Sequence, residues 1–412
     1  MKYGTTKTLR IGGILLAIFF LVCAFALLPQ TVRAQTVTAT VTVGYEPIGV
    51  AVTPNGAYAY VANNGGGSVS VISTATNTVT ETITAGGPTG VAITPNGAYA
   101  YVPDLGRGTV SVISTATNTV TATVTVGSEP FGVAVSPNGA YVYVTNEYDG
   151  TVSVISTATN TVTATVTVGE EPIGVAVTPN SAYVYVTNWG SGYPATVSVI
   201  STATNTVTAT VSVGYSPTGV AVTPNGAYAY VANTGSVSVI STASNTVTAT
   251  ITGAGGNDVA VTPDGKYVYV AGGGSTAESE FGASVYVIST ATNTVTAKVP
   301  VGNLSKGVAV TPNGAYVYVT NEDDGTVSVI NTVSSASPTP TSTSTSPTAT
   351  PTSTTSSTQT PIATPTSFKN PTSSPTVPEF PTMLLALVAM ALIVTASLFA
   401  YRRRNPHNFI LK

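Results

Sequence analysis

The side chains best suited to chemistry in this sequence are carboxylates and aromatic rings. Residues 35–333 contain 15 acidic and 4 basic residues, a net charge of −11, and neither histidine nor cysteine. Most thiol, general-base and transition-metal sites use those two residue types. The whole chain has 412 residues, of which only 7% are charged, and a net charge of −3, which argues against nucleic-acid binding.

Two short acidic segments are the candidate cation sites. They read Asn-Glu-Tyr-Asp-Gly at 146–150 and Asn-Glu-Asp-Asp-Gly at 321–325, and their carboxylates belong to Glu147, Asp149, Glu322, Asp323 and Asp324. Carboxylates bind Ca²⁺, but neither segment has the ligand spacing of a calcium loop. We favour a solvated acidic surface, with weak Ca²⁺ binding as the alternative, and expect no other cofactor.

Aromatic residues occur among glycines in the same kind of segment. They are Tyr45, Phe131, Tyr148, Trp189, Tyr193, Tyr215 and Phe281. Exposed aromatic rings suit contacts with carbohydrate or protein. The alternative is that they pack against neighbouring loops. Asn303, in Asn-Leu-Ser, is a candidate N-glycosylation site.

Seven repeats position these residues. Each contains a Thr/Ser-Pro-Asn/Asp-Gly/Ser turn, and the turn prolines are spaced by 41, 42, 42, 45, 39 and 49 residues. This period is typical of a β-propeller blade. The third repeat predicts four strands, 132–135, 141–145, 152–156 and 161–168, joined by tight turns. A β-helix also has short, regular strands.

The ends of the repeat region favour a closed ring. The last repeat lacks its fourth strand, and a matching strand, 36–43, stands before the first repeat. Pairing of this N-terminal strand into the last blade leaves no open sheet edge. We therefore predict an all-β fold, a seven-bladed β-propeller of four-stranded antiparallel blades, over residues 35–333. The crossovers and the loops between second and third strands vary in length, so their end of the ring is the expected binding face.

The two ends of the chain predict export and anchoring. Basic residues precede an apolar run at 11–28, which is typical of a signal peptide ending at 34 or, alternatively, of an uncleaved anchor. A Ser/Thr/Pro-rich segment, 334–378, predicts an extended stalk. Residues 379–401 hold an uncharged run of transmembrane length, and 402–412 form a basic tail expected on the cytoplasmic side. The propeller is then expected outside the cell.

Two motifs resemble known families. Tyr-Val-Thr-Asn at 143–146, 185–188 and 318–321, with Ile-Ser-Thr-Ala-Thr-Asn-Thr-Val after Val112, Val154, Val199 and Val287, resembles the YVTN-type β-propeller repeats of surface-layer and cell-surface proteins in methanogenic archaea. Pro378, Glu379 and Phe380, before the apolar run, resemble a PEF-type C-terminal sorting signal. That resemblance implies a sorting enzyme that removes the helix and attaches a lipid; a plain membrane anchor is the alternative.

These observations favour a non-catalytic surface protein for adhesion or association with the cell envelope or S-layer. The expected partners are a cell-surface protein or glycan, the envelope and the membrane. The alternative is an extracellular propeller enzyme of the lyase, lactonase or glycosidase type that uses loop carboxylates, because two carboxylates at a suitable separation support glycoside chemistry.

Overall fold

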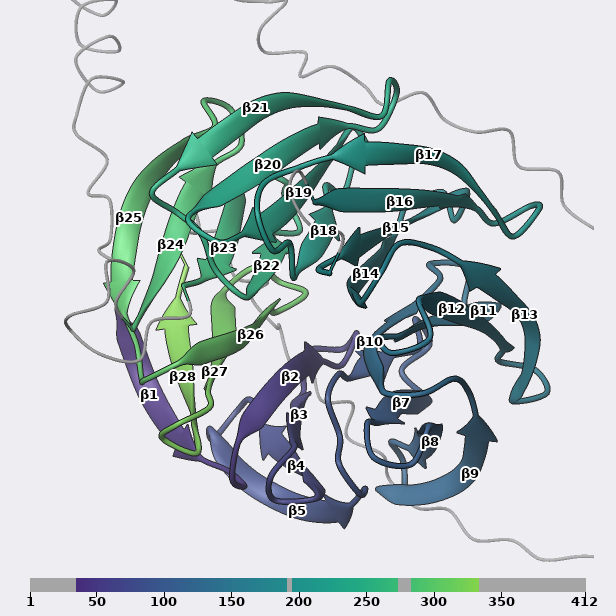
Figure 1. Ribbon diagram of the computed structural model, residues 1–412. Coiled ribbons are helices and arrows are strands. Elements are labelled where there is room, and N and C mark those ends of the chain that lie inside the picture. The colour runs from purple at the N-terminus through teal and green to yellow at the C-terminus, as the bar shows by residue number, and fades with distance from the viewer. Residues whose placement is uncertain (1–34, 191–194, 273–282, 333–412) are drawn as a thin grey trace, which may run out of the picture. The chain divides into compact units, whose positions relative to one another are not determined.

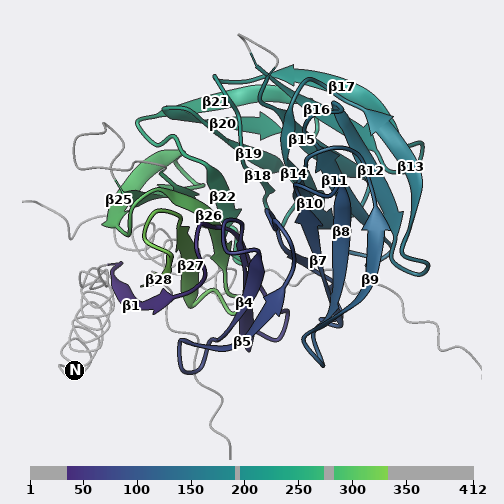
Figure 2. The same ribbon diagram turned by 60° about the horizontal axis from the view of Figure 1, so that its bottom comes forward.

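The computed structural model describes residues 35–190, 195–272 and 283–332, which belong to the first of two compact units, Met1–Pro340. These residues form seven four-stranded antiparallel sheets arranged as the blades of a ring (Figure 1). The prediction of a seven-bladed β-propeller is confirmed. In Figure 2 the strands of the third blade, β10 to β13, lie in order from the centre of the ring outward.

The strands repeat with nearly constant length from blade to blade, except that the inner strands β6, β18 and β22 are shortened to two, three and four residues. In chain order, with the blades separated by semicolons, they are β1 (Val37–Thr42); β2 (Pro47–Val52), β3 (Tyr58–Asn63), β4 (Ser68–Ser73), β5 (Thr78–Thr84); β6 (Ala92–Ile93), β7 (Tyr99–Asp104), β8 (Thr109–Ser114), β9 (Thr119–Thr125); β10 (Pro130–Val135), β11 (Tyr141–Asn146), β12 (Thr151–Ser156), β13 (Thr161–Thr167); β14 (Pro172–Val177), β15 (Tyr183–Asn188), β16 (Thr196–Ser201), β17 (Thr206–Ser212); β18 (Val220–Val222), β19 (Tyr228–Asn233), β20 (Ser236–Ser241), β21 (Thr246–Thr252); β22 (Asp258–Val261), β23 (Tyr267–Ala271), β24 (Ser284–Ser289), β25 (Thr294–Pro300); β26 (Ser305–Val310), β27 (Tyr316–Asn321) and β28 (Thr326–Asn331).

The repeated turns fix the hairpins through their own side chains. In the third blade the Ser136 hydroxyl donates to the Asn138 side chain at 2.7 Å and accepts from the backbone N–H of Tyr141 at 3.0 Å. Gly139 follows with a φ of 72°, which glycine adopts without steric cost. The turn between third and fourth strands ends on Asn160 at a φ of 52°, a conformation that asparagine tolerates well. Residue choice in the turns therefore sets the register of each blade.

The ring closes through strand β1, as the sequence predicts. β1 pairs antiparallel with β28, with Val41 opposite Val327, and completes the sheet β1-β28-β27-β26. Between blades, a buried tyrosine hydroxyl donates to a turn asparagine of the next blade, as from Tyr318 to Asn77 at 2.8 Å. At the closing junction Gln35 stands in the place of that asparagine, and its amide donates to the Tyr269 hydroxyl at 2.9 Å.

The hydrophobic core lies between neighbouring blades. The second and third strands of each blade are buried on both faces, because the adjacent blades cover them. At one junction Tyr143, Val152 and Val154 pack against Val184 and Val186 of the following blade. This arrangement explains why these strands read as nearly continuous apolar runs.

Several predictions fall outside the described residues. They are the signal peptide (1–34), the stalk (334–378), the sorting motif with Pro378, Glu379 and Phe380, the apolar run, the basic tail, and the side chains of Tyr193 and Phe281. Within the described ranges, no helix has the length and hydrophobicity needed to cross a membrane.

Candidate ligand-binding channel

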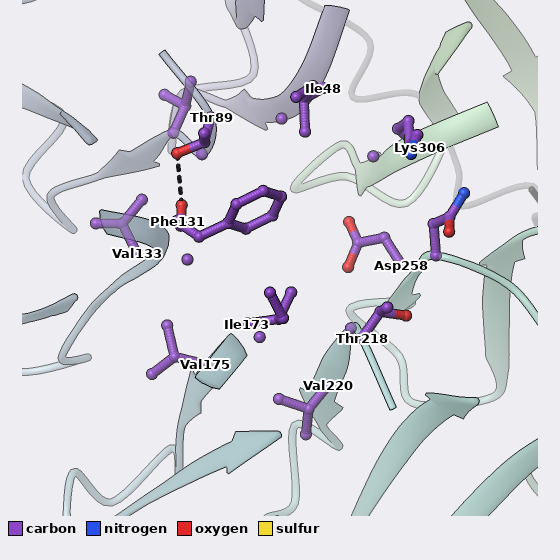
Figure 3. A pocket seen from close by; sticks show the side chains of 18 of the residues that line it. Ile48, Thr89, Phe131, Val133, Ile173, Val175, Thr218, Val220, Asp258 and Lys306 are labelled. Atoms are coloured by element: carbon purple, nitrogen blue, oxygen red, sulfur yellow. Dashed lines mark hydrogen bonds between the residues drawn. The ribbon is translucent and has the colours of Figure 1, made fainter. Parts of the chain in front are cut away.

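A cavity of about 310 Å³ lies where the inner strands of the seven blades converge (Figure 3). Each blade contributes a residue near the start of its inner strand, which is the second residue of the strand in four blades and precedes the strand in the other three. In blade order these residues are Ile48, Thr89, Phe131, Ile173, Thr218, Asn257 and Lys306. Glu147 and Trp189, from the variable loops after β11 and β15, also line the cavity. The cavity therefore belongs to the end of the ring that carries the variable loops and the crossovers.

Close packing around the channel explains the glycine that follows this position in six blades. A Cβ atom on Gly174 would lie 2.1 Å from the carbonyl oxygen of Thr218 in the next blade. A threonine hydroxyl also joins the two blades at this point. The Thr187 hydroxyl accepts from the N–H of Gly174 at 2.8 Å and donates to the carbonyl of Thr218 at 2.6 Å. The backbone of the channel wall is thereby fixed. In other blades the side chain before the glycine makes this contact itself, as where the Thr89 hydroxyl donates to the carbonyl of Phe131 at 2.7 Å.

The sixth blade has Asp258 in place of that glycine. Its carboxylate accepts from the backbone N–H of Val259 at 2.8 Å and, across the blade junction, from that of Val308 at 3.0 Å. The adjacent Asn257 amide also bridges the junction, to the carbonyl of Ser305 at 2.9 Å. Figure 3 shows the Asp258 carboxylate directed into the cavity, toward the ring of Phe131. The chain thus places one acidic group on the wall of the channel.

Protein surrounds this carboxylate closely. Burial raises the pKa of Asp258 to about 6, although the two backbone hydrogen bonds act in the opposite direction. Lys306 also lines the cavity, but its ammonium group lies 3.2 Å from Glu322 and forms an ion pair with that residue. Among the described residues, the ion pairs include none that involves Asp258.

The mouth of the channel is acidic as well. Burial raises the pKa of Glu147, and the nearby carboxylates Glu129 and Glu171 raise it further. Glu129 and Glu171 occupy equivalent places in two crossovers, where each carbonyl accepts a hydrogen bond from the following variable loop. These loops therefore bring three carboxylates toward one side of the mouth.

The structure distributes the sequence-predicted aromatic residues over two environments. Phe131 and Trp189 line the cavity. Tyr45, Tyr148 and Tyr215 are exposed, with 64%, 77% and 58% of their surface accessible. The structure thus brings two of the seven to the channel.

The sequence-predicted acidic residues have different roles in the loops. Asp149 accepts from the N–H of Ser128, and Asp324 accepts from both the backbone N–H and the side-chain amide of Asn303, so each fastens a variable loop to a crossover. Glu322 pairs with Lys306, and Asp323 is exposed. Within the described part of the chain, no three potential ligands of the His, Cys, Asp or Glu type form a metal-binding group. The sequon residue Asn303 is exposed.

Asp258 and its neighbours are not among the residues that the sequence predicts for the site. Six of the seven repeats carry Gly-Val-Ala-Val or Gly-Val-Ala-Ile at the inner strand, and the Asn257-Asp258 pair departs from this common pattern. Alignment of the seven repeats on their turn prolines places Asp258 opposite Gly132 and Gly174, and places Lys306 opposite Phe131. The signal was therefore present as a departure from the repeat.

Comparison with known proteins identifies the family of the ring. The family described as "Lactonase, 7-bladed beta-propeller" matches residues 20–252 and 228–354. Among solved structures, Kuenenia stuttgartiensis hydrazine synthase is similar, with a TM-score of 0.62, 22% identity, and coverage of 70% of this chain and 96% of that chain. This likeness concerns the fold alone. A search of curated proteins found no match. The family match spans more than half of the sequence, and the chain belongs to the seven-bladed β-propeller lactonase family.

Proposed function

We propose that this protein is a non-catalytic, cell-surface binding propeller whose ligand site is the channel at the variable-loop end. The observation that carries this proposal is the cavity itself. Its volume of about 310 Å³ falls within the usual range of small-molecule sites, and its lining combines apolar and polar residues. Side chains differ around the ring while the backbone stays constant, as expected where a scaffold has acquired one specific ligand.

The ends of the chain support display outside the cell. The apolar run at 11–28, the Ser/Thr/Pro-rich segment and the second apolar run before three arginines support export, a stalk and a C-terminal anchor, in that order. The YVTN-type repeats support a role in adhesion or in the cell envelope. A surface glycan or protein is then the natural partner of the exposed aromatic residues around the mouth, among them Tyr45, Tyr148 and Tyr215.

Binding of the isolated ring to a glycan array and to whole cells tests this proposal. Residues 35–332 contain every strand of all seven blades, so this part closes on itself. We expect binding that is lost in Phe131→Ala and retained in the matched variant Tyr99→Ala, whose ring is 42% exposed at the opposite end. The same binding assay with and without Ca²⁺ tests whether the acidic loops bind this ion. Equal binding by both variants would contradict a channel-centred site.

Lactone hydrolysis is the second candidate, and the family match together with Asp258 favours it. A carboxylate with a pKa of about 6 is suited to act as a general base near neutral pH. In such a reaction Asp258 takes a proton from water, the resulting hydroxide adds to the lactone carbonyl, the ring C–O bond breaks, and the released oxygen takes up the proton. We rank this candidate second because Lys306, the cation best placed to stabilise the oxyanion, is paired with Glu322.

Hydrolysis of a panel of aldonolactones, followed by proton release, separates the two candidates. A non-catalytic propeller gives the same rate as buffer. A rate above buffer that disappears in Asp258→Asn and persists in Glu81→Gln, an exposed acid on an outer strand, would establish the enzyme instead.

A further inference from the structure

In the described part of the chain, no ion pair neutralises the Asp258 carboxylate on the channel wall. Asp258 receives only neutral backbone donors from Val259 and Val308, and the ammonium group of Lys306 is held by Glu322. Glu147 adds a further carboxylate at the mouth. A carboxylate enclosed by low-dielectric walls attracts positive charge more strongly than one in open solvent.

The wall opposite Asp258 is apolar and aromatic. The ring of Phe131 extends across the cavity toward the carboxylate, and Ile173 lies beside it (Figure 3). Trp189 and Ile48 also line the cavity. Aromatic rings attract cations through their negative faces, and they also accept the alkyl groups of an organic cation. This wall is a poor site for Ca²⁺, because Ca²⁺ takes six to eight oxygen ligands.

Cavity size limits the occupant to a small molecule. A volume of about 310 Å³ lies at the lower end of the range for small-molecule pockets. The channel therefore has room for a few alkyl groups around one charged nitrogen. Phe131 can contact the alkyl groups, and the Asp258 carboxylate can pair with the nitrogen.

We propose that the channel binds a small alkylammonium ion, with its charged nitrogen next to Asp258 and its alkyl groups against Phe131 and Trp189. This inference rests on the proposed function and names the chemical class of its ligand. Asp258 supplies the charge, and Phe131 supplies the contact surface. Trp189 stands between this cavity and the solvent-exposed loops.

The single tryptophan of the chain makes the site directly observable. Trp189 is the only tryptophan in all 412 residues, and it lines the cavity with 45% of its surface accessible, so tryptophan fluorescence of the full-length protein in non-ionic detergent reports on this edge of the cavity. The probes are choline, butylammonium, and 3,3-dimethyl-1-butanol, which is the uncharged analogue of choline. We expect both cations to change the Trp189 emission in a saturable way, and the uncharged analogue to bind at least about 30-fold more weakly.

Matched variants assign the binding to the named residues. Asp258→Asn should weaken choline binding at least about 30-fold, because a buried charge loses its partner. Phe131→Leu, which keeps the charge and the apolar character, should weaken it about threefold to tenfold. Glu81→Gln, an exposed acid on β5, is the control and should bind like the unmodified protein. If Asp258→Asn fails to fold, Phe131→Leu and the uncharged analogue still decide the question.

The outcomes separate this inference from the function on which it rests. Equal affinity for choline and its uncharged analogue, or unchanged choline binding in both channel variants, overturns the alkylammonium site. A neutral sugar or a lactone that shifts Trp189 emission, while neither cation does, also overturns it but leaves a ligand-binding channel in place. Absence of glycan and cell binding by the unmodified ring in the separate array experiment is what would overturn the proposed function.

Discussion

Replacement of Asp258 by asparagine tests whether a carboxylate in the channel destabilises the folded ring. Burial raises the pKa of Asp258 from 3.8 to about 6. In the unfolded chain the pKa returns to its ordinary value, so the folded state binds the proton more tightly. The stability that this protonation contributes is complete below about pH 4 and is lost as the pH rises through about 6.

The size of the effect follows from the shift. A difference of about two pKa units corresponds to about 3 kcal/mol in the free energy of unfolding. Asp258 is partly exposed to the channel, and solvent there reduces the cost of its charge. We therefore expect a difference of about 2 kcal/mol in the free energy of unfolding. Asparagine keeps the shape and an acceptor for the Val308 N–H without the charge. Asp258→Asn should therefore equal the unmodified protein at pH 4 and exceed its stability by about 2 kcal/mol at pH 8.

Urea unfolding of the two proteins from pH 4 to pH 8, followed by circular dichroism and Trp189 fluorescence, measures this difference. Glu147 and Lys306, which line the channel, and Glu322, the partner of Lys306, are present in both proteins, so the comparison isolates Asp258. With a slope of about 3 kcal/mol per molar urea, the midpoints should separate by about 0.7 M at pH 8. Parallel pH profiles, or a less stable variant at pH 8, would refute the argument that burial of this charge is costly.

Three further predictions concern the ring. Gly174→Ala, which places a Cβ 2.1 Å from the Thr218 carbonyl, should cost at least about 2 kcal/mol in chemical unfolding, while Gly106→Ala, with its nearest neighbour at 4.0 Å, should change stability by less than about 0.5 kcal/mol. Tyr318→Phe removes one hydrogen bond between blades and should cost about 1 kcal/mol in the same assay. Removal of residues 35–43 should expose the edge of β28, and a peptide of the same sequence should restore the lost stability; no rescue would count against closure by β1.

The fold was predictable because its signals recur in every repeat. The turn around Pro137 and the strand that begins at Tyr141 occur in all seven repeats, and the turn that ends at Asn160 occurs in six. An error made in one repeat is therefore corrected by comparison with the others. The closing strand was predictable for the same reason, because Thr36 to Val43 repeats the fourth-strand sequence outside its usual place. The role of Gln35 at the closing junction was not predictable, because Gln35 lies outside the turn motif that marks the asparagines, and its amide donates a hydrogen bond to the tyrosine hydroxyl, whereas their side chains accept one.

The channel was predictable only in part. Phe131, Trp189 and Glu147 stood out by residue type, and the coordinates place all three on one cavity. Sequence alone did not separate them from Tyr148 and Tyr215, which are exposed on the same end of the ring. The difference depends on whether a side chain points toward the axis or away from it, and that direction is set by loop geometry and not by residue type.

Packing between blades explains why chemical variety is confined to one end of the ring. At the opposite end the turns touch their neighbours, since a Cβ on Gly139 would lie 3.6 Å from Cδ of Pro95 in the preceding blade. A change in one such turn disturbs the next blade as well, so these turns stay nearly identical. At the channel end hydrogen bonds join neighbouring blades: the hydroxyl of Thr187 donates to Thr218 from the second strand, whereas Thr218 and Asn257 donate from the channel position itself. Residues of several types can therefore occupy this position, and replacement of a glycine by Asp258 is tolerated because Val308 donates to the new carboxylate. A specific site therefore forms at the end of the ring where packing between blades constrains the side chains least.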